Sequence, residues 1–451
     1  MRNQYYKQID ETVFEETLEN GLKVVVIPKA GFSKTFVTYT THFGSLDHTF
    51  KPHGKDDFVT VPDGVAHFLE HKLFEKEDGD VFTSFAENDA QVNAFTTFDR
   101  TSYLFSATGN VHDNIIRLLK MIESPYFTEK TVEKEKGIIA EEIKMYQEQP
   151  NYKLMFQTLG ALYHNHPVQV DIAGSVESIY DITAEDLYLS YETFYHPANM
   201  VLIIVGDVDP EETIQLVREH EDKRNMHEMP PITRKTIDEP TSVHTPYVET
   251  KMDIVQEKSM LAYKFKPNTI SDKVRVKNDM EMMIALDLMF GEQTEFYQSN
   301  LEKEVIDDTF GYQFANEMTY SYLILAVTTD YHHEFKEAVK AELKKYIENG
   351  FVPEELERVR KQTLGEIVSS LNSPEYIANQ YTKFYFEGVE LFELVNILES
   401  ITVESVQETL ASLIDFDLCC RKSFGETKWL EHLLLVVVVT LAYRLLMNVY
   451  H

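Results

Sequence analysis

Apolar and polar positions along this chain follow two rhythms, one with a period of two residues and one with a period close to 3.6. In the first half, apolar runs rich in β-branched and aromatic residues predict strands at 21–28, 34–39 and 200–205. Residues 184–193 instead repeat apolar positions at helical spacing. The pattern therefore predicts a mixture of helices and strands.

The second half contains the same classes of element. Strands are predicted at 260–265 and 320–328, and helices at 278–289, 353–371 and 376–386. Between the halves, residues 219–250 turn polar and proline-bearing, which indicates a linker. We find no close internal repeat, so any similarity between the halves lies in their elements rather than in their residues.

At 451 residues the chain is too long for one simple core. We expect an N-terminal domain at 1–222, a linker at 223–250, a C-terminal domain at 251–425 and an apolar tail at 426–451. Within that tail, Leu433 to Tyr443 are largely apolar and Arg444 follows. A membrane-spanning helix needs about 20 apolar residues. We therefore expect a buried or adventitious tail, with a membrane anchor as the alternative.

The run His67-Phe68-Leu69-Glu70-His71 carries the most specific chemistry. On a helix, His67 and His71 are one turn apart, so both imidazoles project from one face and can bind one cation. Two neutral imidazoles suit zinc, and a carboxylate such as Glu70 can take a proton from water beside it. Asp63 is a candidate N-cap of this helix. The alternative is a pair of surface histidines on an ordinary amphipathic helix.

A second predicted helix, at about 128–147, offers a third ligand. Glu135 and Glu142 are two turns apart and point the same way, with Ile138 and Ile139 between them. Carboxylates on an apolar stripe are costly to bury unless a cation meets them. Glu141 lies about 100° around the helix and is expected to be solvated. The alternative is that Glu135 and Glu142 are ordinary surface charges.

Together these segments resemble the pitrilysin/insulinase-type zinc peptidases, which include the mitochondrial processing peptidases. The resemblance rests on His67–His71 in the order of the inverzincins, on Glu135–Ile143, and on further motifs in the family's order. Those motifs are Gln91–Phe98 with Thr101–Tyr103, His166-Pro167, Gly174–Ile179 and Tyr195–Val201 with Gly206–Val208. It implies an α+β fold of two structurally similar halves, each a mostly antiparallel sheet layered with helices.

The resemblance also implies roles for individual residues. His67, His71 and Glu142 would bind one zinc ion per chain, and Glu70 would be the general base. Glu135 would orient the site as a partner of its ligands. Asn93 and Ala94 would lie on the strand whose edge pairs with an extended peptide substrate. From the residues alone, Asn93 could also be a strand-end or turn residue.

The composition of the chain bears on its expected partners and compartment. Lys and Arg number 42 against 75 Asp and Glu, a net charge of −33, which disfavours nucleic acid and anionic membrane surfaces as partners. The acidity suits a chamber for cationic peptides or serves only solubility. Only two cysteines, the adjacent Cys419 and Cys420, and no apolar N-terminal signal segment lead us to expect a cytoplasmic protein. The cysteines are poor candidates for ligands.

We therefore expect a zinc metalloendopeptidase that hydrolyses peptides or small processing substrates. The alternative is a non-catalytic scaffold subunit of a peptidase-like complex. Relatives carry an Arg and a Tyr that approach the substrate, and here Leu301 and Asp308 stand at those places. The chain resembles the zinc-bearing member of bacterial pairs, so we expect a heterodimer with a paralogue that lacks the metal motif.

Overall fold

The structure is a computed structural model that describes residues 1–77, 79–224, 226, 229, 231–267, 271–413 and 434–441. It contains two compact units. Unit 1 comprises 1–145, 170–236 and 367–392, and unit 2 comprises 146–169, 237–366 and 393–451. The units are therefore discontinuous in sequence, unlike the contiguous ranges expected above, which stay predictions.

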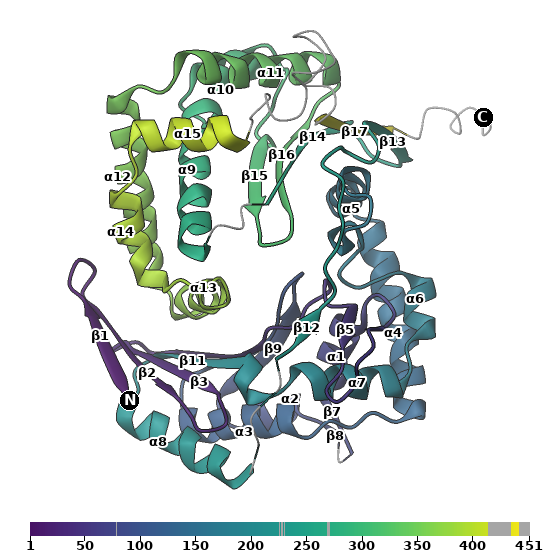
Figure 1. Cartoon of the computed structure of the whole chain (residues 1–451), viewed down its shortest axis with the longest axis vertical. Helices are drawn as coiled ribbons and strands as arrows, with labels where there is room; N and C mark the ends of the chain where they lie inside the picture. The colour runs from purple at the N-terminus through teal and green to yellow at the C-terminus, as the bar shows by residue number, and fades with distance from the viewer. Residues whose placement is uncertain are drawn as a thin grey trace, which may run out of the picture. The chain divides into compact units, whose positions relative to one another are not determined.

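Unit 1 is built on a seven-stranded sheet (Figure 1). The strands, in spatial order, are β1 (Arg2–Tyr6), β2 (Glu11–Thr17), β3 (Lys23–Pro28), β11 (Met200–Gly206), β4 (Thr35–Thr41), β10 (Thr101–Ala107) and β9 (Ala90–Thr96). Only the pair of β3 and β11 is parallel; its register aligns Val201 with Lys23. All of β11 is buried, which explains its continuous apolar sequence.

Helices cover both faces of this sheet. They are α1 (Val65–Lys72), α2 (Phe82–Ala86), α3 (Val111–Glu123), α4 (Glu129–Gln147), α6 (Val176–Asp181), α7 (Ala184–Phe194), α8 (Pro210–Glu221) and α13 (Pro374–Phe386). Helix α13 packs on β4 and β11, where Thr38 and Thr382 share a hydrogen bond. Val37 and Tyr39 of the same strand belong to the main core on the opposite face, because successive side chains alternate between faces.

Unit 2 has a five-stranded sheet with one parallel pair. Its spatial order is β13 (Tyr247–Met252), β17 (Leu434–Leu441), β14 (Lys258–Phe265), β16 (Ser321–Thr328) and β15 (Gly311–Asn316). Its helices are α5 (Pro150–Leu162), α9 (Asp272–Phe290), α10 (Glu295–Glu302), α11 (His332–Asn349), α12 (Pro353–Ser370), α14 (Leu394–Glu399) and α15 (Val403–Leu413), with residues 367–370 of α12 in unit 1. The expected fold, two mostly antiparallel sheets layered with helices, is confirmed.

Two expectations change in detail. The segment predicted as a linker contains the short strand β12 (Thr233–Arg234), which pairs with β5 (Thr49–Lys51), and the first residues of β13. Part of the apolar tail is strand β17, parallel to β13 and antiparallel to β14. The β-branched run is thus hydrogen-bonded along both edges. Cys419 and Cys420 lie outside the described residues.

Candidate metal centre

Helix α1 holds the two histidines against the core of unit 1. Phe68 and Leu69 are fully buried between them, which anchors the helix and directs His67 and His71 to one side. The two imidazole rings lie 4.7 Å apart, centroid to centroid, in an edge-on arrangement. The helical spacing predicted from the sequence is therefore present, on a packed helix.

The start of α1 depends on backbone conformation and not on the expected side-chain cap. Gly64, not Asp63, occupies the N-cap position, with φ of 90° and no side-chain hydrogen bond. A side chain on Gly64 would also press on the Ala173 carbonyl at 2.4 Å. The Asp63 carbonyl instead accepts a hydrogen bond from Ser178 on α6. Only glycine tolerates both the conformation and the contact.

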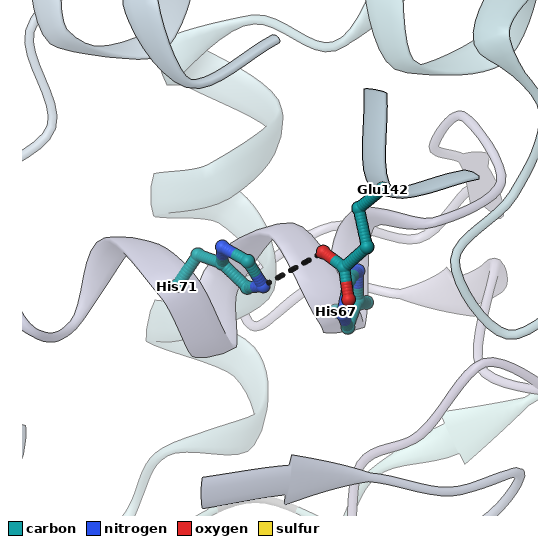
Figure 2. A group of neighbouring side chains, drawn as sticks. All are labelled: His67, His71 and Glu142. Atoms are coloured by element: carbon teal, nitrogen blue, oxygen red, sulfur yellow. Dashed lines mark ion pairs between the residues drawn. The ribbon is translucent and has the colours of Figure 1, made fainter. Parts of the chain in front are cut away.

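Helix α4 brings two carboxylates to these histidines, of which Figure 2 shows Glu142. Glu142 Oε1 lies 3.8 Å from His67 Nε2, and Glu142 Oε2 lies 3.4 Å from His71 Nε2. Glu135, two turns earlier, lies 3.0 Å from His71 Nδ1. Glu141 is exposed and pairs with Lys144, as helical phase predicts. Ile138 is 47% exposed, so the apolar stripe expected there does not include it.

The tautomer of His71 follows from Glu135. A carboxylate can only accept, so Nδ1 of His71 carries the hydrogen and donates it to Glu135 Oε1. When His71 is neutral, as a metal ligand must be, the lone pair of Nε2 faces Glu142. Burial lowers the pKa of His71, but the Glu135 bond and the charges of Glu70 and Glu142 outweigh it and raise the pKa overall.

The donor set fits zinc. One nitrogen from each histidine and one Glu142 oxygen lie within 4.8 Å of one another. Ligands 2.0–2.2 Å from a tetrahedral ion are about 3.4 Å apart, close to the two Glu142 contacts. Those contacts are longer than good hydrogen bonds. Burial and the neighbouring His71 lower the pKa of His67 to about 3, so His67 is neutral and able to ligate.

Glu70 lies beside this centre and is 9% exposed. Its Oε2 accepts a hydrogen bond of 2.6 Å from the Thr96 hydroxyl. Burial raises the pKa of Glu70 by destabilising the charged form, and the Thr96 bond and His71 oppose that rise. A buried carboxylate next to three potential ligand atoms is positioned to exchange a proton with a molecule bound there.

Asn93 and Ala94 lie on β9, which is an edge strand of the described sheet because only β10 pairs with it. The exposed Asn93 side chain accepts a hydrogen bond of 2.9 Å from the Ala94 N–H. Ala94 faces the core, where Val92 also packs. The strand assignment is confirmed. On the free edge of this strand, the Ala94 N–H is already hydrogen-bonded to the side chain of the neighbouring Asn93.

The structure also contains a cluster that sequence reasoning missed. Glu123 of α3 meets His220 and Glu221 of α8, with potential ligand atoms within 4.8 Å. Here, however, Arg224 lies 3.2 Å from Glu123 and 2.8 Å from Glu221. A guanidinium already supplies the positive charge, so this cluster is an ion-pair network. His220 and Glu221 are adjacent in the sequence, so they lack the four-residue spacing that places two ligands on one face of a helix.

Leu301 and Asp308, which the resemblance places where substrate-contacting residues are expected, belong to unit 2. Leu301 is 39% exposed near the end of α10, and Asp308 is exposed before β15. Neither offers the cationic or phenolic donor that the family pattern expects.

Fold and donor set together define a class, metallopeptidases with paired histidines on one helix and a third ligand on another. Residues 61–175 match the family described as Insulinase (Peptidase family M16). Residues 181–363 match the family described as Peptidase M16 inactive domain. The "Uncharacterized zinc protease YmfH" of Bacillus subtilis (strain 168) is 45% identical over 412 residues, covering 91% of this chain and 96% of that protein.

Solved structures are similar to this chain over most of its length. A crystal structure described as a "putative M16-like peptidase" from Alicyclobacillus acidocaldarius aligns with a TM-score of 0.87 and 32% identity, covering 95% of this chain and 98% of that one. A protease from Helicobacter pylori aligns at a TM-score of 0.76 and 18% identity, which supports the fold alone, over 95% and 99% of the two chains. The chain belongs to the M16, pitrilysin-like family of zinc peptidases. In the part of the chain that the structure describes, no helix is long and apolar enough to span a membrane.

Proposed function

We propose that this protein is a zinc-dependent endopeptidase with one zinc ion per chain, bound by His67, His71 and Glu142. The observation that carries the proposal is the convergence of these three donors beside the buried Glu70. Neutral imidazoles and a carboxylate are ligands typical of catalytic zinc. Glu135 holds His71 in the tautomer that leaves Nε2 free to ligate.

Bound zinc supplies Lewis acidity, which polarises a peptide carbonyl and makes water acidic near neutral pH. The chain's own contribution to proton transfer is Glu70. Because Thr96 donates to Oε2, Oε1 is the atom left to accept the proton of the attacking water. Glu70 then returns that proton to the leaving amine as the peptide bond breaks. Peptide hydrolysis by this route needs no serine or cysteine nucleophile.

We place the substrate along the free edge of β9, as an added antiparallel or parallel strand. The Ala94 N–H is an edge donor, and its present acceptor is the exposed Asn93 side chain. A peptide carbonyl could replace that amide oxygen after a rotation of Asn93. Backbone pairing of this kind selects extended peptides rather than particular side chains.

A scaffold role without catalysis is the competing function, and one matched family model is described as an inactive domain. A scaffold has no need for a neutral histidine pair, a facing carboxylate and a buried glutamate in one place. We therefore favour catalysis. We keep the cytoplasm as the proposed compartment on the basis of the low cysteine content.

The test of the proposed function is Glu70→Gln. The amide cannot accept a proton, so hydrolysis of a fluorogenic peptide library should fall by about 10²–10⁴-fold. Zinc content by elemental analysis should not change, because Glu70 is outside the proposed ligand set. Activity equal to that of the wild type would contradict Glu70 as the base.

We further propose that the active species is a heterodimer with an M16 paralogue that lacks the metal motif. Leu301 and Asp308 cannot supply donors to a developing oxyanion, and one such donor is worth about 10²–10³ in rate. A second copy of this chain would lack them too. The partner should therefore raise turnover by at least about tenfold, measured alongside mass in solution. Full turnover by a monomer of this chain alone would falsify the pairing.

A further inference from the structure

The hydroxyl of Thr96 has a single charged partner. Thr96 is the last residue of β9, and its Oγ1 donates to Glu70 Oε2 at 2.6 Å. Among the described residues, no other hydrogen-bond donor reaches the Glu70 carboxylate. A short bond to a charged acceptor is stronger than one between neutral groups. This contact is therefore the main directional restraint on a side chain with three torsions.

The direction of the Thr96 hydrogen bond is fixed by its neighbours. Across the strand pair, Thr96 Oγ1 lies 3.4 Å from Thr101 Oγ1. Thr101 donates its own hydrogen to the Phe43 carbonyl at 2.9 Å. Thr101 therefore cannot donate to Thr96, and the Thr96 hydrogen goes to Glu70 Oε2, the nearer and charged acceptor, at 2.6 Å against 3.4 Å for Thr101. Thr101 is fully buried, which keeps water from its own hydroxyl.

The backbone also restrains Thr96. Its β-branched side chain has few χ1 rotamers, and the strand register opposite Thr101 sets its position. Glu70 sits on α1, which packs against β9 and β10. One hydroxyl thus links the helix that carries the metal motif to the strand proposed to bind substrate.

We propose that Thr96 is a positioning residue for the general base. It holds Oε2 of Glu70, so that Oε1 is directed toward the reacting water and not swung away from it. This inference rests on the proposed function. A misplacement of about 1 Å in a reacting group can cost about 100-fold in rate, so one hydrogen bond at this place can matter.

The test compares Thr96→Val, which removes only the hydroxyl, with Thr96→Ser, which keeps it. For a fluorogenic peptide that the wild type cleaves, Thr96→Val should lower kcat by about 10–100-fold with KM changed less than about threefold. Thr96→Ser should stay within about threefold of the wild type. Zinc content and far-UV circular dichroism should be unchanged. Thr96→Ala repeats the measurement if the valine variant does not fold.

A double mutant separates positioning from general destabilisation. In the Glu70→Gln background, Thr96→Val should change the residual rate by less than about twofold, because its effect passes through Glu70. Thr38→Val is the matched control: it removes a buried hydroxyl bonded to Thr382 in the same unit and should leave kcat within about twofold.

Three results would overturn the inference: Thr96→Val at the wild-type rate, loss of zinc from Thr96→Val, or the same fold-loss with and without Glu70. Each is distinct from failure of the proposed function. That failure would appear as no peptide hydrolysis by the wild type, alone or with its paralogue. Wild-type hydrolysis with an unaffected Thr96→Val contradicts the positioning role only.

Discussion

Unit 1 contains two clusters of histidine and glutamate whose residues are of the same types but whose chemistry differs. In one, His67, His71 and Glu142 face one another with no lysine or arginine bridging them in the described ion pairs. In the other, Arg224 lies between Glu123 and Glu221. The comparison teaches that ligand types alone do not make a metal centre. What matters is whether the protein already supplies the neutralising cation.

Hydrogen bonding separates the clusters as well. His220 Nε2 lies 3.0 Å from both oxygens of Glu123 and donates to that carboxylate, so this nitrogen has no free lone pair. His71 uses Nδ1 for Glu135 and keeps Nε2 available. One histidine is therefore a donor within a network, and the other a potential ligand with a fixed tautomer.

The largest expected difference between the clusters is in zinc content. His71→Ala should reduce bound zinc from about one equivalent to near zero and abolish hydrolysis, because two protein ligands rarely retain zinc. His220→Ala should leave both unchanged. Elemental analysis after dialysis measures this directly. Zinc lost from the His220 variant instead would reverse our assignment of the two clusters.

Within α4, Glu142 and Glu141 should differ almost as strongly. Glu142→Gln replaces a charged ligand by a neutral amide and should weaken zinc binding by more than about 100-fold, beyond the effect typical of outer partners. Glu141→Gln should change it by less than twofold, as expected for an exposed residue paired only with Lys144. Competition with a chromophoric chelator gives both affinities. A large loss of zinc affinity in Glu141→Gln would mean that Glu141, and not Glu142, faces the two histidines.

An intermediate effect is expected at Glu135. Glu135→Gln can still accept through its amide oxygen but loses the charge beside His71, so zinc affinity should fall by about 10–100-fold. Glu133→Gln on the same helix is the control, because Glu133 is exposed and pairs with Lys136. Equal affinities for both variants would show that the Glu135 bond does not tune the site.

A substitution at Arg224 tests whether the second cluster is an ion-pair network, and it should have the smallest effect on the zinc site. Arg224→Met leaves the buried Glu221 without its cation and should cost about 3 kcal/mol of stability, seen as a lower Tm. Zinc at the His67–His71 site should not change. Arg218→Met on the preceding helix α8, whose partner Glu16 is partly exposed, should cost less than about 1 kcal/mol. A Tm unchanged by Arg224→Met would contradict an ion-pair network.

Much of the candidate site could be predicted because helix and strand periods are local. Spacing along α1 placed His67 and His71 together, and spacing along α4 placed Glu135 with Glu142 and away from Glu141. The strand at Asn93 and Ala94 followed from alternation. Ile138 was misjudged, because a period gives the side of a helix but not the neighbour that covers it.

By itself, the sequence determined the family, the class of fold and the three candidate ligands, since local geometry and motif order carry that information. Only the tertiary structure decided the approach of α4 to α1, the positive φ at Gly64 and the Thr96–Glu70 bond. It also revealed Arg224 inside the second cluster and placed 434–441 in a sheet. Apart from the φ of Gly64, each of these depends on residues far apart in sequence, whose meeting is set by packing and backbone pairing rather than by any local period.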